Sequence, residues 1–119
     1  MMSHPLDIAI ARRARALITK PENWCRLWFG EDAKGGAVRY SDLETEAKRL
    51  CAHGAILVAA SEMIPDPNAA DAIAARIVQQ MVGADDECEG MERLWAINFK
   101  DGHPAVLRLF DRFIEGHAQ

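Results

Sequence analysis

The chain has 119 residues, of which 50% are hydrophobic and 27% charged, and this composition excludes wholesale disorder. Its length predicts a single domain, residues 1–119, with one hydrophobic core, and the periodicity described below makes this domain helical. The formal net charge of −4 argues against a general nucleic-acid binder, and the longest apolar run, residues 54–60, is too short to span a membrane.

Residues 6–20 predict an amphipathic first helix. Arg12, Arg15 and Thr19 fall opposite a stripe of apolar side chains at helical spacing, which comprises Leu6, Ile10, Ala14, Leu17 and Ile18. Lys20 precedes Pro21, and a residue before proline is pushed out of the helical region. We therefore expect the helix to end there.

Residues 22–40 read as a small hairpin or ordered loop laid across the helices. The aromatic run 24–29 and residues 37–40 are the two candidate strands, and residues 31–36 between them have turn chemistry. Trp24, Trp28 and Phe29 form either a binding surface or part of the core. We expect Trp24 to be buried, because a small domain needs large core side chains, and leave Trp28 and Phe29 open.

A long central helix is predicted over residues 41–63. Ser41 and Glu44 have the spacing of a capping box, and residues 54–60 are apolar all round, as in a helix buried on most sides. Gly54 is expected to let another helix approach closely.

Three further helices complete the expected architecture. Asp66 and Pro67 signal a helix start, and Gly83 signals its end. Residues 85–90 read as an acidic connector, with a helix resuming near Met91. Residues 104–116 show a clean amphipathic pattern and predict the last helix.

These elements predict a mainly α fold: a single compact bundle of about five helices, with a small β-hairpin or ordered loop between the first two. The side chains expected in its core are Leu17, Leu50, Leu57, Ile73, Ile77, Leu94, Trp95, Phe110 and Ile114.

Cysteine usage and the N-terminus indicate a cytoplasmic protein. Cys25, Cys51 and Cys88 are odd in number and share no CxxC spacing, which is typical of reduced thiols. Residues 1–7 lack the cationic start and apolar run of a secretory signal.

Residues 51–55, Cys-Ala-His-Gly-Ala, resemble a motif in a family of small uncharacterised bacterial and phage proteins. Its members pair a Cys-Ala-Leu-Gly-Ala helix with a downstream Trp-Asn-Asp and a His-x-x-Val helix start. Further matching pieces are residues 15–18, 21–24 and 109–112, Trp95 with Asn98, and His103 with Val106. Here His53 replaces the leucine, two residues separate Trp95 from Asn98, and Pro104 follows His103. The resemblance implies a fold and a shortlist of residues, but no activity.

The strongest candidate for catalysis is Cys51 with His103 and Asn98. A nearby imidazole generates a thiolate and an amide orients the ring, a set suited to acyl transfer or deamidation. Against this, Cys51 falls on an apolar helix face, about ten residues into the expected helix and far from its N-terminal dipole. His103 is also well placed simply to cap the last helix. We expect Cys51 to be structural.

No metal or cofactor is expected. Cys51 and His53 point about 200° apart on a helix and cannot share an ion, and no HExxH, CxxC or phosphate-binding loop is present. The acidic run 85–92 lacks the ligand pattern of a calcium loop. A basic patch on the first helix, made of Arg12, Arg13, Arg15 and Lys20, is read as a solvated face that complements this acidic connector.

The leading functional hypothesis is therefore a non-enzymatic protein-binding or adaptor module that binds a protein partner or a second copy of the chain. The family resemblance adds the hypothesis of an accessory role in a phage or mobile element. The alternative is a small thiol-dependent hydrolase or transferase using Cys51, His103 and Asn98. A third interpretation, a helical nucleic-acid binder, has only the basic patch in its favour. No interaction with a membrane is expected.

Overall fold

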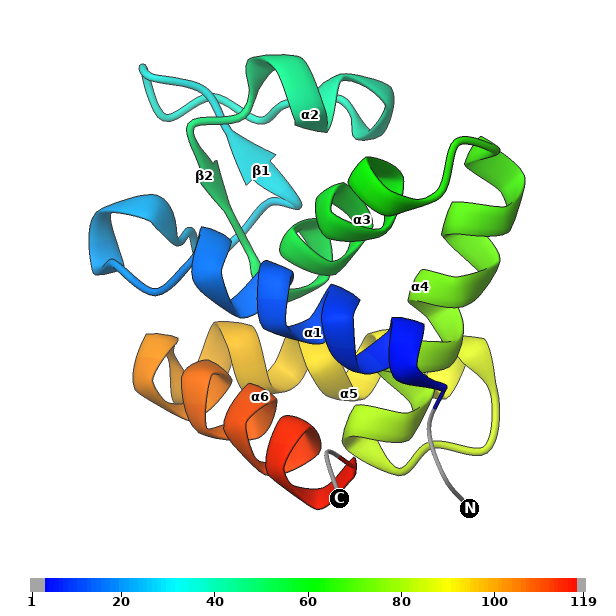
Figure 1. The fold of residues 1–119 in the computed structure, drawn as a ribbon. Helices are drawn as coiled ribbons and strands as arrows, with labels where there is room; N and C mark the ends of the chain where they lie inside the picture. The colour runs from blue at the N-terminus through cyan, green and yellow to red at the C-terminus, as the bar shows by residue number, and fades with distance from the viewer. Residues whose placement is uncertain (1–3, 118–119) are drawn as a thin grey trace.

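A computed structural model of the chain describes residues 4–117, with six α-helices and one pair of short strands in that range (Figure 1). The helices are α1 (Pro5–Leu17), α2 (Leu43–Glu46), α3 (Ala52–Met63), α4 (Pro67–Val82), α5 (Glu87–Ala96) and α6 (His103–His117). The strands are β1 (Gly30–Glu31) and β2 (Arg49–Leu50). The predicted mainly α fold with a small strand pair is confirmed. Residues 1–3, part of the segment expected not to be a secretory signal, lie outside the described residues.

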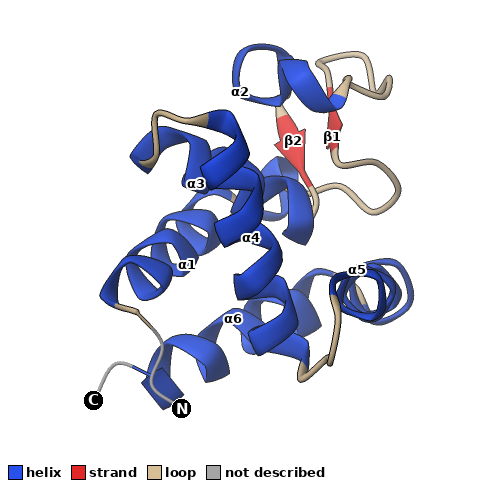
Figure 2. Cartoon of the chain, turned by 90° about the vertical axis from the view of Figure 1, so that its right-hand side faces the viewer, coloured by secondary structure: helices blue, strands red, loops and turns tan. Residues whose placement is uncertain are grey.

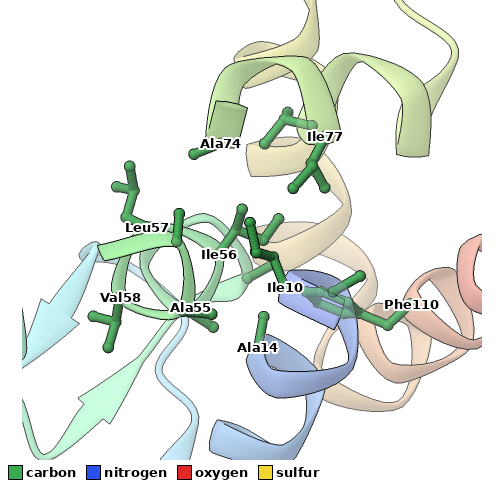
Figure 3. Packing of buried hydrophobic residues seen from close by; sticks show 14 of the residues in the cluster. Ile10, Ala14, Ala55, Ile56, Leu57, Val58, Ala74, Ile77 and Phe110 are labelled. Carbon is green, nitrogen blue, oxygen red and sulfur yellow. The ribbon is translucent and has the colours of Figure 1, made fainter. Parts of the chain in front are cut away.

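The core forms where α1, α3, α4 and α6 meet. Helix α1 packs against α3 and α6, and α4 packs against α3 and α5. Figure 3 shows Ile10, Ile56, Ile77 and Phe110, one from each of the four helices, gathered in this core, and all four are fully buried. Within residues 4–117, no helix is both long and apolar enough to cross a membrane.

Helix α1 ends three residues earlier than expected, at Leu17, and Ile18 is its buried C-cap. Its first turn carries Asp7, which is completely buried and ion-paired to Arg76 of α4, with Arg76 Nε 3.0 Å from Asp7 Oδ2. This pair couples two helices far apart in sequence, and a buried carboxylate is tolerated because it is paired. The apolar periodicity gave no indication of it.

Residues 18–51, which we call the insert, connect α1 to α3 with little regular structure. In the strand pair, Gly30 lies opposite Leu50 and Glu31 opposite Arg49, in antiparallel register. Figure 2 shows the strand pair and α2 together at one end of the helical part.

The expected strands at 24–29 and 37–40 are wrong in position. The chain turns at 25–28, where the Cys25 thiol donates to the Trp28 carbonyl. Asp32 Oδ1 accepts from the amides of Lys34 and Gly36, which closes a tight turn, and Ala37 meets Glu31 only as an isolated bridge.

The expected continuous helix 41–63 is also wrong. Helix α2 ends at Glu46, the strand β2 follows at Arg49–Leu50, and α3 begins at Ala52. Ser41 lies in a 3-10 turn, Tyr40–Asp42, and the N-cap of α2 makes no side-chain hydrogen bond, so the capping box does not form. The amides of Lys48 and Cys51 instead donate to the carbonyls of Glu31 and Phe29, and this long-range pairing outweighs helix propensity.

Helix α4 has the predicted signals at both ends. Asp66 accepts from the Asn68 amide, Pro67 is the first helical residue, and Gly83 adopts a left-handed φ of 69°. Helix α5, however, begins at Glu87, four residues before Met91, because Asp86 caps it by accepting from the Glu89 amide. Much of the expected acidic connector is therefore helix, and its carboxylates stabilise the N-terminal end of α5.

Most of the expected core is confirmed. Five of its members are buried: Leu50, Leu57, Ile77, Leu94 and Phe110. Leu17, Ile73 and Ile114 are half-buried and pack against the core. Trp95 is the error, since it is 52% exposed. Leu94 occupies the buried face of α5, and the next residue points about 100° away.

Candidate functional site

A pocket of about 580 Å³ lies between the loop at residues 26–29, the start of α3, and α5. Four large apolar side chains at this pocket are exposed: Leu27 (52%), Trp28 (46%), Met91 (38%) and Trp95 (52%). Its lining also includes Phe29, Cys51, His53, Leu94 and Asn98. Two segments more than sixty residues apart in sequence thus contribute apolar side chains to one hollow.

Asn98 fixes the insert against the helices. It lies in a π-helical turn, Ile97–Asp101, that follows α5. Its Oδ1 accepts from the Trp24 indole at 2.8 Å and from the Ala52 amide at 3.0 Å. Its Nδ2 donates to the carbonyls of Cys25 and Arg26 at 3.2 and 2.9 Å. All the hydrogen-bonding capacity of this amide is used to position protein groups.

Gly54 allows the loop to approach α3 closely. A Cβ atom at Gly54 would lie 2.0 Å from the Phe29 carbonyl oxygen, which already accepts from the Cys51 amide. The close neighbour predicted for Gly54 is therefore present, but it is the backbone of the loop and not another helix.

Cys51 is the N-cap of α3, not a residue deep within a helix as expected. Its Sγ accepts from the Gly54 amide at 3.3 Å. Burial nevertheless raises the pKa of this thiol, and this effect outweighs the backbone hydrogen bonds that lower it. Burial likewise raises the pKa of Cys25 to about 12. Both thiols are therefore protonated at neutral pH.

His103 and Cys51 make no hydrogen bond to each other. His103 is the first residue of α6, so the expectation that it caps this helix from outside is wrong. Its Nε2 lies 2.6 Å from the Ile18 carbonyl, and its ring packs on Trp24 with centroids 5.4 Å apart. The structure thus brings Cys51 and Asn98 to the pocket, and His103 is not among the residues that line it.

His53 is the imidazole at the pocket, although it was not among the site residues expected from the sequence. It also borders a neighbouring hollow and packs edge-on against Phe29, with ring centroids 5.2 Å apart. Burial lowers its pKa to about 4, so the ring is neutral at pH 7. The sequence signal that could have identified His53 is that it replaces the leucine of the Cys-Ala-Leu-Gly-Ala motif.

The three aromatic residues proposed from the sequence differ in their surroundings. Trp24 is half-buried and bonded to Asn98. Trp28 is exposed at the pocket, and Phe29 is half-buried, edge-on to Tyr40 and His53. Trp95, which was assigned to the core, stacks on Phe99 with centroids 4.9 Å apart.

Two residues of the basic patch have ion-pair partners outside the acidic connector. Arg13 pairs with Glu62 at 2.8 Å, and Arg15 pairs with Asp111 at 2.6 Å. For these two residues, the expectation that they complement the acidic connector is wrong. Among the residues that the structure describes, no three His, Cys, Asp or Glu side chains are grouped to hold a metal ion.

Fold and pocket together define a small helical protein with an inserted strand pair and an apolar hollow beside it. Residues 2–115 match a family described as a family of unknown function (DUF6197), and the chain belongs to this family. No curated protein and no solved structure matches the chain.

Proposed function

We propose that the protein is a non-enzymatic binding module whose pocket receives an apolar side chain of a partner protein. The observation that carries the proposal is the convergence of Leu27, Trp28, Met91 and Trp95 on one hollow, with all four side chains exposed. Exposed apolar side chains gathered at a cavity are typical of interaction sites, and aromatic residues dominate binding energy at such sites.

The size and rigidity of the pocket support this role. A volume of about 580 Å³ is within the range of ligand pockets and accommodates one or two large side chains. The hydrogen bonds of Asn98 and the close approach at Gly54 hold one wall in place. A preformed pocket loses less conformational entropy on binding.

The thiol-enzyme alternative receives less support from the geometry. It requires a base beside Cys51, and the His103 ring is bonded to the Ile18 carbonyl while burial raises the pKa of the Cys51 thiol. Cytoplasmic location and an accessory role in a phage or mobile element remain predictions from the cysteines and the family resemblance.

The test is a selection of random twelve-residue peptides displayed on phage, followed by affinity measurements with a matched pair of variants. Met91 and Met63 are almost equally exposed, at 38% and 39%, and only Met91 lines the pocket. Met91→Gln should weaken binding of the selected peptides about tenfold, the effect of losing one well-buried apolar contact. Met63→Gln should leave it within twofold. Equal effects of the two substitutions, or no selected peptide, would contradict the proposal.

A further inference from the structure

The apolar pocket is the first of three adjacent hollows, which together we call the groove. His53 and Met91 line both this pocket and a neighbouring hollow, and Tyr40, Leu57 and Asp71 line both that hollow and a third one. The three hollows are therefore neighbours, and the Tyr40–Asp71 hydrogen bond joins the insert to α4 where the second hollow meets the third. They run between the insert on one side and α4 and α5 on the other.

Carboxylates line this groove along its length. Glu92 borders the apolar pocket, Glu87 and Asp71 border the middle hollow, and Glu44 borders the far one. Within residues 4–117, none of these four forms an ion pair with a cationic side chain. The Tyr40 hydroxyl donates to Asp71 Oδ1 at 3.0 Å, which fixes that carboxylate in the groove.

Positive charge in the groove is confined to its apolar end. Arg26 is the one Lys or Arg side chain among the residues that line the three hollows in the described chain. Its guanidinium donates to the Phe99 carbonyl and lies over the Trp24 ring, 5.3 Å from the centroid. Arg26 is thus held by Trp24 of the insert and by the Phe99 carbonyl, and the middle hollow is lined by two carboxylates and by no Lys or Arg side chain.

We infer that the groove binds a cationic segment of a partner protein, which inserts an apolar anchor beside Trp28 and Trp95 and lays Lys or Arg residues along Asp71 and Glu87. This inference rests on the proposed function and adds the partner's chemistry to it. Charge complementarity favours this occupant over an acidic segment or a nucleic acid, because both would meet uncompensated carboxylates. A row of three hollows also favours a chain segment over a compact small molecule.

The experiment uses the peptides selected from the twelve-residue library on the full chain. Sequences that bind should combine an aromatic or Leu residue with two or more Lys or Arg residues. Glu87→Gln and Asp71→Asn, which keep side-chain shape, should each weaken their binding three- to tenfold. Glu115→Gln on the exposed face of α6 is the matched control and should leave affinity within twofold. Raising salt from 0.05 to 0.5 M should weaken wild-type binding more than binding to the doubly neutralised variant.

The outcomes separate this inference from the proposed function. One outcome is that the selected peptides are neutral, with an affinity that depends on Met91 but not on Glu87. That result would contradict the inference of a cationic partner and would still support the proposed binding module. Peptide binding that depends on neither Met91 nor Glu87 would overturn both the inference and the proposed function. Sedimentation of the chain alone provides one more check: a dimer that Met91→Gln dissociates would identify a second copy as the occupant and overturn the inference.

Discussion

The helical part and the insert of residues 18–51 are stabilised in different ways. The helices meet through fully buried apolar side chains such as Ile10, Ile56 and Phe110. The insert has only two residues in each strand and contributes Leu43 and Leu50 to the core, and it is further fixed to the helices by the hydrogen bonds of Asn98 and by the backbone contact at Gly54. The helical core therefore depends on apolar packing, whereas the pocket wall depends on a few hydrogen bonds and one close backbone contact, and substitutions can test the two separately.

The largest effect is expected in the helical core. Phe110→Ala should lower the free energy of unfolding by about 4 kcal/mol, because it removes a large, completely buried ring and leaves a cavity. Denaturant titration at neutral pH measures the loss. A loss below about 1 kcal/mol would show that the core is not where we place it.

The second largest effect is expected from Gly54→Ala, which should lower the free energy of unfolding by about 3 kcal/mol. The new methyl group would clash with the Phe29 carbonyl oxygen, so either the loop or α3 must move. Gly116→Ala is the matched control in α6, because nothing lies within 4 Å of its added Cβ and alanine favours helix. A Gly54→Ala variant with wild-type stability would refute the close contact.

Asn98→Ala should lower the free energy of unfolding by about 2 kcal/mol and loosen the insert where it meets α3 and α5. It leaves the Trp24 indole, the Ala52 amide and two carbonyls without their partner. Because Cys25 and Cys51 are both buried near this amide, their alkylation rates should rise in the variant, measured by mass spectrometry. The exposed Cys88 serves as the internal reference. In the wild type, a Cys51 that alkylates faster than Cys88 would instead favour the thiol-enzyme alternative.

A smaller, pH-dependent effect on stability is expected from His53 in the wall of the pocket. The folded state lowers its pKa from 6.5 to about 4, so the unfolded state binds the proton more readily as pH falls. The folded state therefore has its full stability from this residue above pH 6.5, where the ring is neutral in both states. It loses stability progressively as the pH falls from 6.5 toward 4, because protonation then favours the unfolded state. His53→Leu should remove about 2 kcal/mol of this acid sensitivity between pH 7.5 and 4.5. Identical pH profiles for the variant and wild type would contradict the burial of this ring.

The sequence was informative where local chemistry decides structure. Asp66, Pro67 and Gly83 signalled both ends of α4 because capping depends on neighbours in sequence. The break in the expected helix 41–63 was not predictable in this way, because it depends on pairing between Lys48 and Glu31 and between Cys51 and Phe29. Local propensity carries no information about such long-range partners.

The site was only partly predictable for the same reason. Cys51 and Asn98 were selected as possible catalysts, and the structure places both at the pocket, where Asn98 acts as a hydrogen-bonding hub. Trp28 was identified as an open question, whereas Trp95 was assigned to the core. No pattern in the sequence indicated that these two tryptophans line one hollow, since the fold alone brings the two segments together.

The central claim, that the pocket between the insert and α5 is a binding site, is tested most directly by the methyl NMR spectrum of the methionines. The chain would be titrated with the strongest peptide from the phage selection. Met91 lines the pocket, Met81 is buried in the core, and Met63 is exposed elsewhere, so the three methyl groups report on different places. We predict that the Met91 resonance shifts in proportion to peptide bound, while those of Met63 and Met81 stay in place. A shift of Met63 with no change at Met91 would contradict the account.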